Sequence, residues 1–289
     1  MPNVIQYNPE HDPASGDIIT GMPIQIYHAH ENSISNSGLS LIARSPAHYR
    51  YGPPRTPSRA QVIGQALHSC LLEPELFERE YINAGTPNRT ASEYKQAVNQ
   101  IGDPSRVLTQ PEHDNIRMAV ESVWAQSGPR ALLESDDHRE LSVFATDPET
   151  GVMVRIRPDI IAGGGVLIDL KKTQDARAPA FERAIMHYRY HVQAALYMDA
   201  WRWASGDSTL SWQILAVEEQ PPHAAKIYEL DDTALAEGRK LYREALDQYA
   251  HCLERDEWPA YPCDEPELIG LPSWRVAQIE DEMEVNIDE

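Results

Sequence analysis

Two aspartates and a lysine form the group in this sequence that is best suited to chemistry. Asp159 and Asp169 flank two short apolar runs joined by Gly163-Gly164-Gly165, a pattern that predicts a β-hairpin. With the turn centred on Gly164, Asp159 lies directly opposite Asp169, where Cβ atoms are about 4.5–5.5 Å apart. Lys171 follows Asp169 by two residues and shares its face. Carboxylates this close repel each other unless a cation or proton intervenes, so we expect a divalent metal, with the lysine stabilising a hydroxide or a phosphorane.

A solvated hairpin with incidental charges would show the same pattern, because Asp…Asp-x-Lys is a common arrangement. His68 favours the catalytic interpretation, since it interrupts the apolar end of a helix that opens with a capping box of Ser58 and Gln61. Gly64, four residues earlier, leaves space on the turn that carries the imidazole. By itself, a histidine in this setting is more often a core residue.

A polar stripe is expected on the helix that follows the hairpin. Arg189, Gln193 and Tyr197 are spaced by four residues and so share one helix face. Such a stripe is ordinarily the edge of an amphipathic helix. Further carboxylates at Glu73 and Glu140 fit solvated or structural roles better than roles in the site.

Apolar periodicity predicts helices in the first part of the chain and strands after them. The expected helices cover residues 38–44, 58–73, 91–101, 111–126, 179–203 and 232–255. The expected hairpins join residues 141–146 to 152–156 and residues 160–162 to 166–168, and two more strands cover 209–218 and 223–229. This order predicts an α/β sandwich with one mixed sheet.

Four short motifs in a fixed order resemble a known family. They are Gly64-Gln65-Ala66-Leu67-His68, Pro158-Asp159, Asp169-Leu170-Lys171 and Gln193-Ala194-Ala195-Leu196-Tyr197. The set resembles the RecB-type branch of the PD-(D/E)xK nucleases and is most similar to the exonuclease VIII (RecE-type) nuclease domain of phages and prophages. The resemblance spans residues 33–262. It implies a restriction-endonuclease-like α/β core, with a central mixed β-sheet flanked by helices and an N-terminal helical extension.

The resemblance also implies a role for each matched residue. His68, Asp159, Asp169 and the backbone carbonyl of Leu170 would bind Mg²⁺, for which Mn²⁺ could substitute. Lys171 would position and activate the attacking water. Gln193 and Tyr197 would orient the motif or the scissile strand. Lys172 departs from the family, in which a small polar residue is expected, and we interpret it as a phosphate contact.

Basic and hydroxyl side chains are candidates for DNA binding. Exonucleases of this branch grip a terminal 5′-phosphate near the active site, and Arg44 or Arg50 with Ser37 or Ser40 would do so here. Solvated arginines are an equally good interpretation of these positions. Arg189 is a further candidate for contact with the DNA.

The function implied by the resemblance is a Mg²⁺-dependent exodeoxyribonuclease that digests linear double-stranded DNA 5′→3′ and leaves 3′ single strands for recombination. The alternatives are a structure-selective or restriction-type endonuclease and a DNA-end-binding module without cutting activity. Expected partners are duplex DNA ends, a single-strand annealing protein and further copies of the chain in a ring. The expected location is the cytoplasm of a bacterial host.

Charge is distributed unevenly along the chain. The net charge is −20, which taken alone argues against nucleic-acid binding. Residues 254–289 contain 12 acidic and 2 basic residues, whereas residues 155–203 contain 8 basic and 5 acidic ones. We therefore expect a flexible arm at 1–32, a nuclease domain at 33–262 and an acidic tail at 263–289. The tail, in particular residues 281–289, would serve solubility, dock a basic partner or repel DNA from the outer surface.

Several other classes of site are disfavoured by the sequence. Three cysteines cannot supply the four thiolates of an iron–sulphur cluster, and their odd number indicates a reduced intracellular protein. His187 and His191 have zinc-ligand spacing, but no third ligand is evident. No phosphate-binding loop of an ATPase, nucleophile elbow or membrane-spanning apolar run is present.

Overall fold

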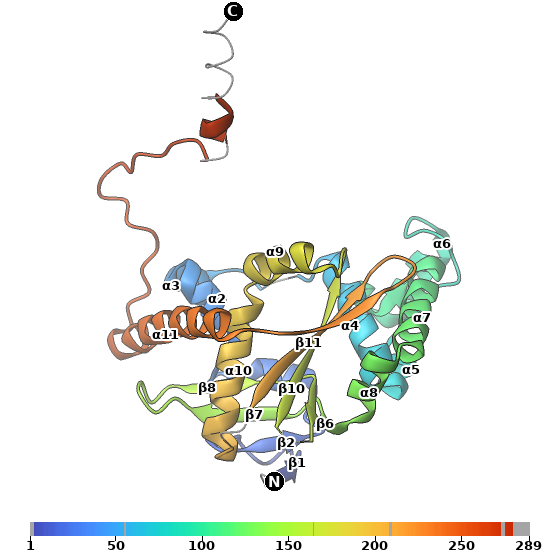
Figure 1. The fold of residues 1–289 in the computed structure, drawn as a ribbon, viewed down its shortest axis with the longest axis horizontal. Helices are drawn as coiled ribbons and strands as arrows, with labels where there is room; N and C mark the ends of the chain where they lie inside the picture. Colours follow the sequence, from blue (N-terminus) through green and yellow to red (C-terminus); the bar gives the residue numbers. More distant parts are fainter. Residues whose placement is uncertain (1–2, 55, 164, 208–209, 273–274, 280–289) are drawn as a thin grey trace, which may run out of the picture. The chain divides into compact units, whose positions relative to one another are not determined.

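The computed structural model describes all residues except 1–2, 55, 164, 208–209, 273–274 and 280–289. The chain forms one compact unit that ends at Trp258 and a second, much smaller unit from Pro259 onward (Figure 1). Within the second unit, a short helical segment covers residues 275–279. The predicted stretch 281–289 lies outside the described residues.

The sheet that carries the two aspartates has five strands. Their order is β12 (Ala225–Glu229), β11 (Ser211–Glu218), β10 (Val166–Thr173), β9 (Ile160–Ala162) and β6 (Asp136–Arg139). β10 pairs antiparallel with β9 and parallel with β11, so the sheet is mixed. The predicted hairpin register is confirmed, with Leu167 opposite Ile161 and Ile168 opposite Ile160. Gly164, the predicted centre of the turn, lies outside the described residues.

Both faces of this sheet are buried. Successive β10 and β11 side chains alternate between two hydrophobic clusters, as the two-residue period of a strand requires. Ile168 and Leu215 pack with helices α4 (Arg59–Leu72) and α7 (Gln110–Ala125), whereas Leu167 and Ile214 pack with α10 (Tyr190–Ser205) and α11 (Asp232–Arg255). Asp169 has the same parity as Leu167 and therefore faces α10.

A second five-stranded sheet contains the first predicted hairpin. Its order is β1 (Val4–Gln6), β2 (Ile18–Thr20), β7 (Ser142–Thr146), β8 (Met153–Ile156) and β3 (Ile34–Ser35). A two-stranded sheet joins β4 (Ile82–Asn83) to β5 (Val107–Leu108). The α/β class with mixed sheet and flanking helices is confirmed, but the strands divide among these sheets instead of forming one.

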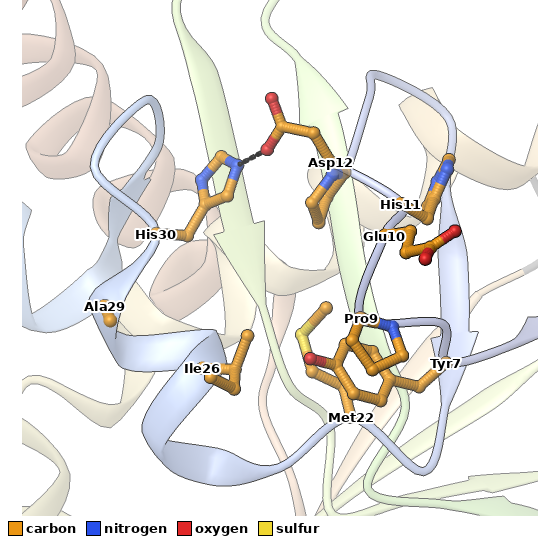
Figure 2. A pocket seen from close by; sticks show the side chains of 10 residues that line it. Tyr7, Pro9, Glu10, His11, Asp12, Met22, Ile26, Ala29 and His30 are labelled. Atoms are coloured by element: carbon orange, nitrogen blue, oxygen red, sulfur yellow. Dashed lines mark ion pairs between the residues drawn. The ribbon is translucent and has the colours of Figure 1, made fainter.

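The N-terminal segment differs from the predicted flexible arm. β2 pairs with β7, and Ile18 and Ile19 are each 1% exposed. Helix α1 (Ile24–Ala29) follows and buries Tyr27 against Phe144. Proline and glycine in residues 1–21 obscured a strand whose partner lies more than a hundred residues later. A hollow of about 280 Å³ lies between the segment of Tyr7 to Pro13 and α1, with His30 directed toward Asp12 (Figure 2).

Helices α2 (Asn36–Arg44), α6 (Ser92–Ile101) and α7 lie close to their predicted positions. The sequence pattern did not predict the short helices α3 (Pro46–Tyr51), α5 (Pro74–Glu80), η1 (Pro104–Arg106) and α8 (Ser127–Glu134). α4 begins with the predicted capping box, because Ser58 Oγ accepts from the Gln61 N–H and the Gln61 side chain accepts from the Ser58 N–H. α11 covers the predicted 232–255.

The single long helix predicted at 179–203 is two helices. α9 (Ala178–Tyr188) ends and α10 begins at Arg189, whose φ of 59° is left-handed. No glycine or proline marks this break, and the helical periodicity continues through it, so the sequence pattern does not reveal it. The break changes the direction of the chain immediately before Gln193.

Helices α10 and α11 approach each other closely through Gly238. A Cβ atom at this position would lie 2.1 Å from the backbone oxygen of His191. Since no side chain fits there, the glycine permits the contact. This packing fixes α11 closely against the helix that carries Gln193 and Tyr197.

Candidate active site

Helix α4 delivers His68 to the edge of the sheet. Its neighbours Leu67, Cys70 and Leu71 are buried in the cluster beneath β10, which fixes the rotation of the helix. The His68 side chain remains 25% exposed, and its Nε2 atom lies 3.0 Å from Asp159 Oδ1. His68 is therefore a member of the site and not a core histidine.

Glu140 completes a group of three potential metal ligands. His68 Nε2 lies 3.3 Å from Glu140 Oε1, and one ligand atom from each of His68, Glu140 and Asp159 lies within 4.8 Å of the others. The expectation of a solvated or structural Glu140 is wrong in this respect, since the side chain is 16% exposed and faces the histidine. We call these three residues the ligand triad.

The backbone around Glu140 explains its position. Glu140 lies between β6 and β7 with a left-handed φ of 52°, which is uncommon for a non-glycine residue. Its N–H donates to the Asp159 carbonyl oxygen at 3.1 Å. Arg157 Nε donates to the Glu140 carbonyl oxygen at 3.1 Å and lies 3.2 Å from the carboxylate. The same guanidinium donates to the Met22 carbonyl oxygen, which links the N-terminal segment to the site.

A second network surrounds the motif lysine. Lys171 Nζ lies 2.7 Å from Asp169 Oδ2 and donates to Gln193 Oε1 at 3.0 Å. The Gln193 amide in turn donates to Asp169 Oδ1 at 2.7 Å. Lys171 Nζ also lies 4.8 Å from the ring centre of Tyr190, in a cation–π contact. Gln193 therefore orients both charged partners at once.

The two aspartates have different surroundings. Asp159 Oδ2 accepts the Leu170 N–H at 2.6 Å, which leaves Oδ1 directed to His68. Asp169 is 3% exposed and bound to Lys171 and Gln193. The structure thus places two of the predicted ligands, His68 and Asp159, in the triad, and Asp169 beside it. The Leu170 carbonyl remains a predicted ligand.

Tyr197 lies in the core beneath the motif. It is 9% exposed and packs edge-to-face on Trp212, with ring centres 5.6 Å apart. Its pKa is raised well above the usual value because of burial, although the backbone N–H of Arg157 opposes the shift by donating to its oxygen. This position supports orientation of the segment that leads to Asp159, without direct exposure to a substrate.

The electrostatics of the site reflect buried charges of like sign. Burial raises the pKa of Glu140 and of Asp169. Burial acts to lower the pKa of His68, but Asp159, Glu140 and Asp169 outweigh it and raise the pKa to about 9. Burial likewise acts to lower the pKa of Lys171, and the two aspartates reverse that effect. The carboxylates therefore favour the positively charged forms of His68 and Lys171.

The donor set fits a divalent cation. The triad offers two carboxylate groups, which suit hard ions such as Mg²⁺ and Mn²⁺, and one imidazole nitrogen, which suits first-row transition metals. Glu140 Oε1 is buried and has no hydrogen-bond donor among the described residues. A cation at this position would satisfy that oxygen and remove the repulsion between the two carboxylates. Such an ion polarises a phosphoryl oxygen and lowers the pKa of water.

The predicted DNA-binding residues of the N-terminal part make contacts away from the ligand triad. Ser37 Oγ lies 2.9 Å from Ser35 Oγ, and Ser40 Oγ donates to the Asn36 carbonyl oxygen. Arg50 is exposed, with its guanidinium 5.7 Å from the ring centre of Trp258, and Arg44 is exposed near the end of α2. Their grip on a 5′-phosphate remains a prediction.

Two further basic residues are partly engaged by the protein. Lys172 Nζ pairs with Glu219 Oε2 at 2.5 Å, so its predicted phosphate contact competes with this carboxylate. Arg189 is half-buried at the helix break, and its Nε atom is buried without a hydrogen-bond partner within the described chain. Its contact with DNA remains a prediction.

The alternative zinc pair is not assembled. His187 lies in the last turn of α9 and is exposed, whereas His191 lies in α10 and is 2% exposed. The break at Arg189 removes the shared helix face on which the i,i+4 spacing depended. Among the described residues, the ligand triad is the group of three with metal-binding geometry. No described helix has the length and apolar character needed to cross a membrane.

The fold and the site together define the class of protein. A mixed sheet covered by helices on both faces presents Asp159, Asp169 and Lys171 from adjacent strands, as in PD-(D/E)xK nucleases. This chain belongs to the family described as PDDEXK-like domain of unknown function (DUF3799), whose model matches residues 37–272. The predicted resemblance to PD-(D/E)xK nucleases is confirmed. No curated protein matches the chain.

Solved structures share the fold. A candidate exonuclease from Eubacterium rectale is 14% identical with a TM-score of 0.59, and the match covers 89% of this chain and 97% of that one. A phage-related exonuclease from Haemophilus somnus 129PT is 16% identical, with a TM-score of 0.33 and coverage of 80% and 100%. An alkaline exonuclease from Laribacter hongkongensis is 13% identical, with a TM-score of 0.29 and coverage of 66% and 97%. The first match supports the fold, and the other two are too distant to add to it.

Proposed function

We propose that this protein is a divalent-metal-dependent exodeoxyribonuclease that hydrolyses linear double-stranded DNA, with Mg²⁺ as its metal and Mn²⁺ as a substitute. The observation that carries the proposal is the convergence of the ligand triad with the Lys171–Asp169–Gln193 network. Phosphodiester hydrolysis requires a cation near the phosphoryl oxygens and a positive group near the attacking water. The ligand triad can hold the cation, and Lys171 supplies the positive group near the attacking water.

Each residue of the chain then has a defined task. Asp159, fixed by the Leu170 N–H, and Glu140, fixed by Arg157, present carboxylate oxygens that need no reorientation. Lys171 orients the water and stabilises negative charge that develops on the phosphoryl group, because its ammonium is held by Gln193. Water adds to phosphorus and gives up a proton to solvent, the bond to one ester oxygen breaks, and that oxygen takes up a proton from solvent.

We further propose that digestion runs 5′→3′ and leaves 3′ single strands for recombination. The support for this is the sequence resemblance to RecE-type nucleases and the exposed Arg44 and Arg50 in its N-terminal part. A ring of several copies and a single-strand annealing partner belong to the same proposal. In such a ring, the basic segment 155–203 would face the DNA. Light scattering under active conditions tests the assembly, and a strictly monomeric active species would contradict it.

The proposal is tested by comparing linear with closed-circular duplex DNA in Mg²⁺, with and without a chelator. Degradation of the linear DNA alone, abolished by the chelator, is the expected result. Cutting of circles would instead identify an endonuclease, and binding without cutting would identify a DNA-end-binding module. Strand-specific labels then read the polarity, and a comparison of 5′-phosphoryl with 5′-hydroxyl ends tests the arginines. Equal rates on both ends would remove their proposed role.

A further inference from the structure

The end of helix α9 exposes large apolar side chains beside the active site. Tyr188 is 63% exposed and Met186 is 64% exposed. Isolated exposed apolar residues need no explanation, but Tyr188 is not isolated. It is the outermost ring of a continuous aromatic column.

The column anchors Tyr188 from below. Its ring centre lies 5.5 Å from that of Tyr190, with planes inclined by 21°. Tyr190 packs on Phe181 at 6.1 Å, and the fully buried Phe181 stacks on Tyr228 at 4.8 Å and 10°. The Tyr228 hydroxyl donates to the Ala176 carbonyl oxygen, which fixes the inner end. The exposed ring is therefore held in place before any ligand arrives.

The helix break makes this stacking available. Residues two apart on a continuous helix point in nearly opposite directions and do not face each other. The left-handed backbone of Arg189 brings the rings of Tyr188 and Tyr190 together instead. A non-glycine residue keeps this conformation where its surroundings impose it, and such residues cluster at functional sites.

The column also contacts the catalytic network. Lys171 Nζ lies 4.8 Å from the Tyr190 ring centre, so Tyr188 is one ring further out from the lysine. A nucleic-acid strand whose phosphate is presented to Lys171 carries bases within reach of that next ring.

We infer that Tyr188 is a stacking platform for a nucleobase of the DNA strand being cleaved, within a nucleotide or two of the scissile phosphate. This inference rests on the proposed nuclease function. Every base has a π-face, so the contact tolerates any sequence, as a nuclease that digests along a strand requires. A ring already fixed by Tyr190 loses little conformational freedom on binding. The platform would hold the strand while Lys171 and the ligand triad act on its backbone.

The test uses linear duplex DNA with 2-aminopurine at the first or second nucleotide of each end, in Ca²⁺ or with chelator to prevent cleavage. In the wild-type protein, stacking on Tyr188 should change the fluorescence of the probe at one end. Tyr188→Leu should lose this change and weaken end binding by about 5- to 150-fold, as removal of one stacked base does. Tyr188→Trp should retain both. Tyr261→Leu removes a similarly exposed tyrosine beyond the compact unit and serves as the matched control.

Kinetics separate a platform from a structural residue. In Mg²⁺, Tyr188→Leu should raise KM more than it lowers kcat, with an unchanged melting temperature. If the wild-type protein cleaves DNA and Tyr188→Leu matches it in fluorescence and KM, the inference is wrong and the proposed function stands. If the wild-type protein does not cleave, the proposed function itself fails. A Tyr188→Leu variant that changes only the mass measured by light scattering would show that the ring covers another protein copy, which also overturns the inference.

Discussion

The backbone N–H of Glu140 donates to the carbonyl oxygen of Asp159 at 3.1 Å, although the two residues lie in separate segments of the chain. This hydrogen bond continues the pairing of β6 with β9 and brings one oxygen of each carboxylate close to His68 Nε2, at 3.0 Å for Asp159 and 3.3 Å for Glu140. The pairing of β6 with β9 therefore brings Glu140 and Asp159 together, although the two residues are not close in sequence. The geometry of the ligand triad depends on how Glu140 is held.

Glu140→Gln should strongly weaken divalent-metal binding at the triad. The substitution keeps the shape of the side chain but removes the negative charge beside His68 that attracts a cation. Loss of an outer partner costs about 10- to 100-fold in metal affinity, so loss of a ligand should cost about 100-fold or more. Calorimetric titration with Mn²⁺ measures the effect. Glu121→Gln, on the exposed side of α7, is the control and should bind like wild type. Equal Mn²⁺ affinity in Glu140→Gln would exclude it as a ligand.

Arg157 should act as a positioning residue for Glu140. Its guanidinium bonds the carbonyl oxygens of Glu140 and Met22 and pairs with the Glu140 carboxylate. A lysine keeps the charge but cannot make these contacts together. We expect Mn²⁺ affinity to fall about 10- to 100-fold in Arg157→Lys and at least as much in Arg157→Met. If Arg157→Met is folded and binds Mn²⁺ like wild type, Glu140 is positioned by its backbone alone.

Gly238→Ala should destabilise the fold. The added methyl group would lie 2.1 Å from the His191 carbonyl oxygen, so α10 and α11 must separate. Overpacking of this kind costs about 1–3 kcal/mol, which thermal unfolding detects. Gly128→Ala is the matched control, since its nearest heavy atom would be 3.8 Å away. Equal melting temperatures for the two variants would show that α10 and α11 do not pack as described.

The buried ion pair of Asp147 and Arg243 should make stability depend on pH. Burial acts to raise the pKa of Asp147, but hydrogen bonds from Arg243 and Thr150 outweigh it and lower the pKa. A carboxyl whose folded pKa is lowered stabilises the protein above its unfolded pKa of about 3.9 and loses that contribution as pH falls through the folded value. Asp147→Asn should cost about 3 kcal/mol at pH 7.

The difference between this variant and wild type should shrink as the pH falls below about 4, because the carboxyl of the unfolded wild-type chain then binds a proton that the folded protein does not bind until its lower folded pKa is reached. Denaturant titrations from pH 3 to 7 measure it. A difference that stays constant over this range would show that the pair makes no pH-dependent contribution.

The sequence predicted the parts of the site that depend on local pattern. The hairpin of β9 and β10 follows from alternation around a glycine turn, and the position of His68 follows from a capping box and apolar spacing. The register of that hairpin is sufficient to predict that Asp159 and Asp169 lie together. These features require contacts only between residues that are near in sequence.

The parts that were missed depend on distant contacts or on unmarked backbone geometry. Glu140 joins the triad through pairing of β6 with β9 and a left-handed φ that no glycine signals. The break at Arg189 interrupts a continuous helical pattern in the same way. β2 pairs with a strand more than a hundred residues away. Neither this distant pairing nor the proline-rich composition around β2 gives a local pattern that predicts a strand. The sequence offered one signal for Glu140: it is a charged residue directly after β6, the strand that pairs with β9 of the hairpin.

The most direct test of the central claim is the Mg²⁺-dependent rate at which linear duplex DNA is degraded by wild type and by Lys171→Ala. Lys171 stabilises charge at the reacting phosphate but is not a triad ligand, so the variant should keep its metal affinity and remain folded, with a lower melting temperature because Asp169 loses its ion-pair partner. The account predicts chelator-sensitive degradation by wild type and a rate about 100- to 1,000-fold lower in Lys171→Ala. Degradation by Lys171→Ala at the wild-type rate would contradict it.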